Sequence, residues 1–454
     1  MEKKYIGVGV IGLGVVAGQV SKVLCEREEF LSAQLGFPLK LKKVKVLPQD
    51  MTRPLAKSLP EGVLTTDEDD FFNTPGLDIV VEAIGGEYPA FNLLSRGLSI
   101  VVEAIGGEYP AFNLLSRGLK MGKCVVTSNK EVIAKHAPEL VKLAKDNNVG
   151  LRCEASVGGG IPLISPFQYD LAANHIKGIY AIINGTTNYI LTRMAKEGLD
   201  FATALKQAQS LGYAEANPSN DIEGTDAVYK LAIMASINFQ CVVKPEDIYR
   251  EGISRLTSRD FCYADELGFN IKLLAITKPG NGQIEARVHP VFLPKDDWLA
   301  KVDGVFNAVL VEGDLVGPVL FQGQGAGALA TSSAVVADVL AAAQDIHLGV
   351  GNRMRWNMDK PLGIKPMSDI LTRYYLRMTV TDSPGVLALI AKVLGDHSIS
   401  ISSVIQKETD EKNLTAEIVI MTHPAKEAFV QQALVKLGGL DKVKEINNFV
   451  RVGI

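Results

Sequence analysis

The sequence lacks several features that would assign it to a specialised class of protein. Its 454 residues include only five cysteines and no CxxC pair, which argues against a disulfide framework and a cysteine-ligated metal cluster. The net charge at pH 7 is only −4, so no basic excess indicates nucleic acid or an anionic membrane as a partner. No apolar run reaches the roughly 20 residues that a membrane-spanning helix needs. With 47% hydrophobic residues, the chain is expected to form two or three domains of a cytoplasmic globular protein.

A glycine-rich segment near the N-terminus is the first candidate site. Residues 5–11 predict a buried strand, Gly12–Ala17 a loop, and the residues from Gln19 onward a helix. In this order the glycines let the backbone turn tightly and approach a pyrophosphate at the helix N-terminus. The pattern alone is also typical of tight turns, and the apolar run superficially resembles a signal peptide, but its glycines favour a dinucleotide site. The candidate cofactor-binding residues are Gly12, Leu13, Gly14, Val15 and Val16.

The segment after the next predicted strand, Leu41–Leu47, bears on the choice of cofactor. An acidic residue at the end of this strand would favour the free 2′-hydroxyl of NAD, whereas basic groups accommodate the 2′-phosphate of NADP. Asp50 comes only three residues later, and Arg53 and Lys57 follow. The arrangement favours NADP, with Arg53 as the candidate residue, although a solvated charged loop has the same composition.

Two segments of the chain are identical. Ile79–Leu98 and Ile100–Leu119 both read IVVEAIGGEYPAFNLLSRGL, at a spacing of 21 residues. Each copy predicts a strand, a Gly-Gly loop and a helix that opens at proline. A single perfect doubling indicates a recent duplication or an error in the sequence. Either the sheet gains an extra βα unit, or one copy is extruded and exposes its apolar residues.

We predict that the second copy holds the native place, because it connects directly to the following strand. On this view Ile100–Glu103 pairs beside Val125–Thr127. The loop at Gly106 then faces the cofactor, and the first copy is peripheral or poorly packed.

The most specific stretch of the sequence is Ala208–Lys230. Its Asn-Pro dipeptide and Gly224 are turn and helix-start signals, so a loop should feed a helix that begins near Thr225. Asp226 and Lys230 then lie on one helix face. The carboxylates of this stretch could hold an ammonium-bearing substrate while Lys230 supplies a proton. An exposed ion pair, worth roughly a few tenths of a kcal/mol, would have the same sequence pattern. Three more carboxylates precede the helix, those of Glu215, Asp221 and Glu223.

Four further segments combine glycines or polar residues with the boundary of an element. The first predicts a strand entering a polar loop, and the second places backbone carbonyls beside a carboxylate, as a hard cation requires. The third predicts a capped helix, and the fourth a second glycine-rich helix start. Each also fits a purely structural role, as a solvated loop, a helix entry, a cap or close helix packing. In the order just described, the segments are Val125–Lys130, Glu154–Pro162, Ile182–Leu191 and Gly323–Gly327.

The C-terminal region has its own pattern. Residues 346–370 mix glycine, proline, asparagine and aspartate without periodicity, as linkers do. Strands and helices in the order βαββαβ follow, which is a ferredoxin-like arrangement. Their expected ranges are Tyr375–Thr381, Pro384–His397, Ile399–Gln406, Leu414–Met421, Lys426–Leu437 and Val443–Val452.

The spelling of these motifs resembles that of homoserine dehydrogenases with a C-terminal ACT domain, over nearly the whole chain. Asp382-Ser-Pro-Gly-Val-Leu is similar to the start of an ACT domain. The departures are the doubled segment, Ala17 at the place of a third glycine, and Asn217 in place of a common aspartate. The most specific match consists of Ala208, Gly212-Tyr-Ala, Asn217-Pro218, Asp221-Ile, Gly224, Asp226 and Lys230.

The resemblance implies an α/β protein of three domains. These are a Rossmann-type NAD(P)-binding domain (1–153), an α+β mixed-sheet catalytic and dimerisation domain (154–345) and, after a linker (346–370), a ferredoxin-like ACT domain (371–454). It implies reversible reduction of L-aspartate 4-semialdehyde to L-homoserine with NADPH or NADH, in threonine, methionine and isoleucine biosynthesis. We expect a homodimer or homotetramer whose ACT domain binds an amino-acid effector, L-threonine being the first choice. No nucleic acid or membrane partner is expected.

The same resemblance implies roles for individual residues. Lys230 would donate the proton, Asp226 would orient Lys230, and Lys130 would lie beside the reacting carbonyl. The implied substrate-binding residues are Glu215, Asp221, Gly185 and Thr186. Besides the first glycine loop and Arg53, the implied cofactor-binding residues are Gly106, Thr127, Lys130 and Gly325. A monovalent cation such as sodium would be held by Glu154 and by the carbonyls near Val157, Gly159 and Ile161.

Two alternatives remain at this point. One is a different NAD(P)-dependent enzyme on the same architecture, such as a dihydrodipicolinate-reductase-like protein, against which Asn184–Tyr189 and Asp221–Lys230 argue. The other is a pseudoenzyme disabled by the duplication, which retains an amino-acid-sensing ACT domain. A turnover assay with aspartate semialdehyde distinguishes them.

Overall fold

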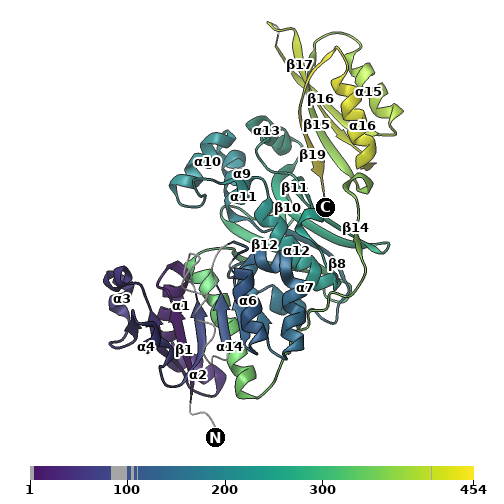
Figure 1. Ribbon diagram of the computed structural model, residues 1–454. Coiled ribbons are helices and arrows are strands. Elements are labelled where there is room, and N and C mark those ends of the chain that lie inside the picture. The colour runs from purple at the N-terminus through teal and green to yellow at the C-terminus, as the bar shows by residue number, and fades with distance from the viewer. Residues whose placement is uncertain (1–4, 83–99, 104–106, 110, 411, 454) are drawn as a thin grey trace. The chain divides into compact units, whose positions relative to one another are not determined.

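The computed structural model describes the chain except residues 1–4, 83–99, 104–106, 110, 411 and 454 (Figure 1). The chain forms two compact units, each assembled from separate stretches. The first unit comprises Met1–Ala173, Ala232–Pro245 and Gly323–Lys360, and the second comprises Asn174–Leu231, Glu246–Gln322 and Pro361–Ile454.

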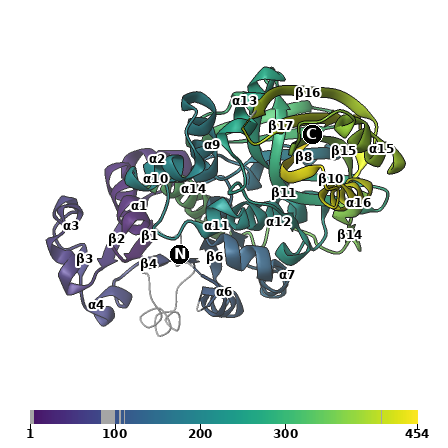
Figure 2. The ribbon, with the colours of Figure 1, turned by 90° about the horizontal axis from the view of Figure 1, so that it is seen from above.

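The first unit is built on a parallel sheet of seven strands, which confirms the predicted Rossmann-type domain. Its strands are mostly apolar, as strands covered on both faces must be. Figure 2 shows β3 at the outer edge of this unit, beyond β2 and β1. The order across the sheet is β3 (Leu64–Thr65), β2 (Leu39–Lys45), β1 (Ile6–Ile11), β4 (Leu77–Glu82), β5 (Ile100–Glu103), β6 (Cys124–Thr127) and β7 (Leu151–Arg152).

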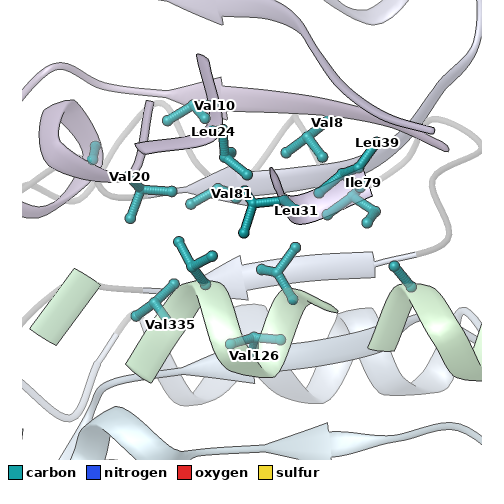
Figure 3. Packing of buried hydrophobic residues seen from close by; sticks show 14 of the residues in the cluster. Val8, Val10, Val20, Leu24, Leu31, Leu39, Ile79, Val81, Val126 and Val335 are labelled. Atoms are coloured by element: carbon teal, nitrogen blue, oxygen red, sulfur yellow. The ribbon is translucent and has the colours of Figure 1, made fainter. Parts of the chain in front are cut away.

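Helices pack on this sheet and close its core. Figure 3 shows Val335, on the late helix α14 (Ala328–His347), among buried side chains from strands that include Val81 and Val126. Each such side chain, once removed from water, stabilises the fold by about 1.5–3 kcal/mol. The other helices of this unit include α1 (Val15–Glu26), α2 (Glu28–Leu35), α3 (Pro54–Ser58), α4 (Glu68–Phe72), α6 (Ala111–Lys120), α7 (Lys130–Asp146) and α8 (Ile164–Gln168).

Helix α14 also departs from the expectation that no segment could span a membrane. Among the described residues, it is long and apolar enough to do so by length and composition alone. Half of its most apolar window is buried inside the structure, and the helix packs against α1 and β6. It is therefore used here as a core helix.

The strands of both identical segments belong to the sheet. The second-copy strand β5 pairs in parallel with β6, from Ile100 opposite Cys124 to Glu103 opposite Thr127, which confirms the predicted pairing. The prediction that the first copy is peripheral is wrong for its strand: β4 lies between β1 and β5, and Ile79 and Val81 are fully buried. The apolar residues Ile79–Val81 at its centre suit a strand that is covered on both faces. The predicted cofactor loop at Gly106 lies outside the described residues.

The second unit contains one continuous mixed sheet. Its central path is β13 (Gly317–Gln324), β12 (Phe306–Gly313), β8 (Ile176–Ile182), β10 (Phe269–Gly280), β11 (Gln283–Pro294), β19 (Val443–Val452), β15 (Leu371–Thr381), β17 (Thr415–Thr422) and β16 (Ile401–Asp410). Short strands pair along it: β9 (Tyr249–Arg250) and β14 (Gly363–Ile364) with β11, and β18 (Ala425–Lys426) with β15.

The ferredoxin-like order at the C-terminus is confirmed. Strand β15 leads into α15 (Val386–Asp396), β16 and β17 follow, and α16 (Glu427–Gly438) precedes β19. This subdomain continues the larger sheet, because Val291 and Phe292 of β11 pair with Arg451 and Val452 of β19. The remaining helices carry or flank the candidate site: α9 (Gly185–Glu197), α10 (Phe201–Ser210), α11 (Ser219–Ile222), α12 (Thr225–Phe239) and α13 (Ser258–Glu266).

Candidate active site

A buried ion pair marks the start of helix α12. The helix begins at Thr225, as predicted, so Asp226 and Lys230 lie one turn apart. Lys230 Nζ donates hydrogen bonds to Asp226 Oδ2 at 2.8 Å and to the carbonyl oxygen of Ile183 at 2.9 Å. Only 8% of Lys230 and 5% of Asp226 are exposed. This burial excludes the reading of the pair as an exposed surface contact.

Asn184 connects this pair to a second carboxylate. Its Nδ2 donates to Asp226 Oδ2 at 2.9 Å and to Asp221 Oδ1 at 2.7 Å, while its Oδ1 accepts a hydrogen bond from the Thr187 amide and caps α9. Neutral amide donors can hold two carboxylates close together without adding charge. The sequence predicted only a capped helix here, so the bridging role of Asn184 is a new finding.

The cluster needs these extra bonds because buried charges are costly. Removing two ions from water costs several kcal/mol each, and their attraction repays this only when the remaining donors and acceptors are also satisfied. Asp226 accepts from both Lys230 and Asn184, and Lys230 donates in addition to a backbone carbonyl. An arrangement that is held so closely around a buried amine is suited to positioning a proton.

The other predicted substrate residues lie at the start of α9 and in the turn before α11. Gly185 has no room for a side chain, since an added Cβ would lie 2.7 Å from the Val305 carbonyl oxygen. Thr186 Oγ1 donates to the carbonyl of Tyr213 at 2.5 Å, which joins this turn to α9. Glu215, two residues further on, is exposed. Within the described residues, Asp221 but not Glu215 is bonded to the cluster.

The predicted dinucleotide loop has the expected form in the first unit. Gly12 has φ +102°, a conformation that favours glycine, and its amide bonds to the Lys45 carbonyl. Gly14 is the N-cap of α1, and Val15, the first residue of that helix, is 75% exposed. The free amides of this helix start and the partial positive charge there suit a phosphate.

Arg53 is held directly at this loop. Its Nη1 donates to the Leu13 carbonyl oxygen at 3.1 Å, and its Nε lies 2.8 Å from Asp50 Oδ1. The side chain is half exposed, so the guanidinium keeps a face toward solvent. Lys57 is also exposed. The structure thus places the predicted phosphate-binding arginine against the predicted phosphate-binding loop.

The Thr-Ser-Asn-Lys segment lies at the carboxyl end of β6 in the same unit. Thr127 is buried and its Oγ1 accepts from the Asn129 amide, while Asn129 caps α7 through the Val132 amide. Asn129 Nδ2 also donates to the Gly107 carbonyl at 2.8 Å. Lys130 is the first residue of α7 and is half-buried.

The predicted cation segment packs by backbone contact. Glu154 is buried, and its carboxylate accepts hydrogen bonds from the amides of Leu163 (2.6 Å), Ile164 (3.0 Å) and Ser165 (2.7 Å). This charge is therefore satisfied as a cap of α8, a role that fits it better than that of a cation ligand. In the described part of the chain, no group of three or more His, Cys, Asp or Glu side chains is arranged for a metal.

The glycines of the predicted cation segment also allow close contact with the start of α14. A Cβ on Gly159 would lie 2.4 Å from the Gly325 carbonyl oxygen, and the Gly160 amide donates to Gln324. The segment with Val157 and Ile161, both buried, thus contacts the glycine-rich start of α14 backbone to backbone. Asp338 on α14 accepts from the Glu154 amide at 2.9 Å, and burial raises the pKa of Asp338 to about 7.

Comparison with known proteins shows what the chain is similar to. Residues 162–340 match the family model for homoserine dehydrogenase, and residues 374–434 match the ACT domain. The homoserine dehydrogenase of Neisseria gonorrhoeae is 38% identical over 454 residues, which cover 99% of each chain. The crystal structure of a homoserine dehydrogenase from Thiobacillus denitrificans has a TM-score of 0.85 at 39% identity, covering 99% of this chain and 98% of that one. A hyperthermophilic archaeal homoserine dehydrogenase mutant in complex with NADPH has a TM-score of 0.59 at 27% identity, covering 74% and 97%.

Proposed function

This chain belongs to the homoserine dehydrogenase family, and from that premise we propose that Lys230 exchanges the proton with the reacting oxygen of the substrate. The family consists of NAD(P)-dependent oxidoreductases of amino-acid biosynthesis, which interconvert L-aspartate 4-semialdehyde and L-homoserine. When bound, the nicotinamide supplies or accepts the hydride. The protein must hold the substrate carbon in place and give a proton to the oxygen that becomes the hydroxyl.

The observation that carries this assignment is the buried pair of Lys230 and Asp226. Two acceptors, Asp226 Oδ2 and the Ile183 carbonyl, fix the position of the Lys230 ammonium. These two acceptors hold the ammonium in place, and it is this group that would donate the proton to the substrate oxygen. During homoserine oxidation the same amine, once neutral, takes the proton from the hydroxyl.

Asp221 and Glu215 are proposed to hold the ammonium group of the substrate. Asp221 is anchored by Asn184 at 2.7 Å and is only half-buried, so its carboxylate is accessible to the ammonium group of a substrate. Glu215 is exposed on the turn that Thr186 joins to α9, and its carboxylate would add a second negative charge for the substrate ammonium. Gly185 and Thr186 would line the same space.

The cofactor assignment rests on the first unit. We propose NADP rather than NAD, because Arg53 holds a guanidinium against the Gly12–Gly14 loop. The exposed helix start at Val15 and Val16 would face the pyrophosphate, and Thr127, Lys130 and Gly325 would border the nicotinamide end. The cation site stays a prediction, and no step of the reaction depends on it here.

Regulation and the repeat complete the proposal. We propose that the ACT domain binds L-threonine and that the identical segments reflect duplication of one βα unit, since both copies contribute a strand to the same sheet. Resequencing the coding DNA would show a single copy if the doubling were an error.

The test of the catalytic assignment is a pair of buried-lysine variants. Lys230→Met should lower turnover by about 10²–10⁴-fold, the range for loss of a general acid, and leave NADPH binding unchanged. Lys272→Met is the matched control, because Lys272 is also buried and bonded to a carbonyl and to Asp303, but outside the signature stretch. It should lose stability without a comparable loss of turnover. Near wild-type turnover in Lys230→Met would remove Lys230 from the proton-transfer role.

A further inference from the structure

In the second unit, neighbouring strands cover one edge of strand β11 only in part. Two short strands pair with β11 on this side: β14 opposite Gln283 and Ile284, and β9 opposite Arg287 and Val288. Figure 1 shows β14 beside β11 on the segment that leads into the C-terminal subdomain. The residues between the two short strands face a cavity rather than a neighbouring strand.

The cavity has a volume of about 290 Å³. This is at the lower end of the roughly 300–1,000 Å³ typical of small-molecule sites, so it fits a ligand of metabolite size. One wall is apolar, and the rest carries charged groups. The lining residues are Asp247, Tyr249, Ala286, Arg287, Ile364, Lys365, Pro366, Met367 and Ile370.

Arg287 is the unusual member of this lining. It is 4% exposed, yet its nearest polar contacts are long: 3.5 Å from Nη1 to His289 Nε2 and 3.7 Å from Nη2 to Glu285 Oε2. Its Nε is buried and has no hydrogen-bond partner among the described residues. Arg451, on the neighbouring strand β19, shows the usual alternative, with contacts of 2.6, 2.8 and 3.0 Å to Glu427 and Glu251.

A buried guanidinium that makes no short hydrogen bond is suited to binding an anion. Buried charges are normally paired through short hydrogen bonds, because an unpaired buried charge is expensive. Burial lowers the pKa of Arg287; the Glu285 carboxylate offsets part of this effect, and Arg451 adds to it. His289 adds no acceptor charge, since burial and the same two arginines hold its pKa well below 6.5. A carboxylate in the cavity would supply the missing acceptor.

The opposite charge stands at the rim of the same cavity. Asp247 ends a short 3-10 helix and is exposed, so its carboxylate can meet a cation at little cost. The cavity is also lined by Ile364, Met367 and the buried Ile370. Lys365 is already engaged by Glu285 at 3.0 Å. An arginine, an aspartate and an apolar wall together match a free amino acid with an aliphatic side chain.

We propose that this cavity binds a small aliphatic α-amino acid, with its carboxylate on Arg287, its ammonium at Asp247 and its side chain against Met367. The site lies outside the matched ACT segment, residues 374–434, and on the segment that enters β15. A ligand here contacts both the sheet that carries the catalytic helices and the segment leading into the ACT domain. It is therefore placed to bias the position of that domain.

The binding test uses the full-length protein and L-valine, L-isoleucine and L-leucine as probes, measured by calorimetry; L-threonine is not a probe, because the ACT domain is proposed to bind it. Asp247→Asn should weaken binding by at least about tenfold, the effect expected from losing a charge-assisted hydrogen bond, and Met367→Trp should abolish it by filling the cavity. Glu246→Gln is the matched control: its residue precedes Asp247, is exposed and does not line the cavity. It should bind as the wild type does.

Three results would overturn the proposal. They are the absence of binding by all three probes, binding that is equal in every variant, and binding that is lost in Met367→Trp but unchanged in Asp247→Asn. Butyrate, which lacks the ammonium, should bind at least about tenfold more weakly than L-valine. Homoserine oxidation without effector should be the same in all these variants, so a failure of the catalytic assignment is seen separately.

Discussion

Replacing Asn184 by aspartate would test whether the buried carboxylates depend on a neutral bridge. The substitution keeps an oxygen for the Thr187 amide, so helix α9 retains its N-cap. It removes the Nδ2 donor that lies 2.7 Å from Asp221 Oδ1 and 2.9 Å from Asp226 Oδ2. A carboxylate oxygen replaces that donor and faces the oxygens of Asp221 and Asp226.

The expected loss follows from the charges. Two unit charges 4 Å apart interact by about 4 kcal/mol at an effective dielectric constant of 20, and the new carboxylate faces two such neighbours. Lys230, 2.8 Å from Asp226, offsets part of the repulsion. We expect the N184D variant to lose roughly 3–5 kcal/mol of stability at pH 8.5, as when a buried pair is broken. The loss should be smaller at pH 5, because repulsion raises the folded-state pKa of the added carboxyl and protonation then relieves it.

Urea denaturation at both pH values measures this difference. Asn217→Asp is the control, since it adds the same charge at an exposed position of the stretch Ala208–Lys230 and should change stability by less than about 0.5 kcal/mol. The KM for homoserine should rise in N184D and not in N217D. A stability loss that is equal at pH 5 and pH 8.5 would refute the reasoning.

Three further predictions concern the cofactor, pH and the ACT domain. Arg53→Ala should weaken NADPH binding more than NADH binding, as measured by fluorescence titration, whereas Lys57→Ala should change the two alike. Asp338→Asn should raise stability by about 2–4 kcal/mol at pH 8, because the buried carboxyl with pKa about 7 must ionise there, and the gain should shrink at pH 5. L-Threonine should inhibit homoserine oxidation, and Asp382→Ala, in the exposed turn before α15, should raise the concentration needed.

The catalytic pair could be predicted from the sequence because its geometry is local. A helix that starts at Thr225 necessarily places Asp226 below Lys230, and the Gly224 turn marks that start. The bridge through Asn184 could not be predicted in the same way. It joins residues 37 and 42 positions apart, which meet because the fold of the second unit brings the start of α9 to the start of α12. The one available signal was the cap position of Asn184 inside a motif of the family.

The role of a side chain could be predicted less well from residue type where that side chain bonds to the backbone. Glu154 beside three glycines has the composition of a cation site, but its oxygens accept three amides that follow nine to eleven residues later. Nothing in the composition distinguishes a carboxylate that caps a helix from one that binds a cation. Glu215 shows the same limit, since its place in the signature predicts substrate contact while the turn that carries it is exposed.

The two identical segments show most clearly that position, rather than residue type, decides a contact. The first-copy strand β4 lies beside β1, which leads into the Gly12–Gly14 loop. The second-copy strand β5 lies beside β6, and its loop is tied to α7 through Gly107 and Glu108, the latter bonded to Lys135 and His136. Three strand spacings of about 4.8 Å thus separate β1 from β6, where a sheet with one copy would have two. A single strand in this place would contact β1 on one side and β6 on the other. Here β4 makes the contact with β1, and β5 makes the contact with β6.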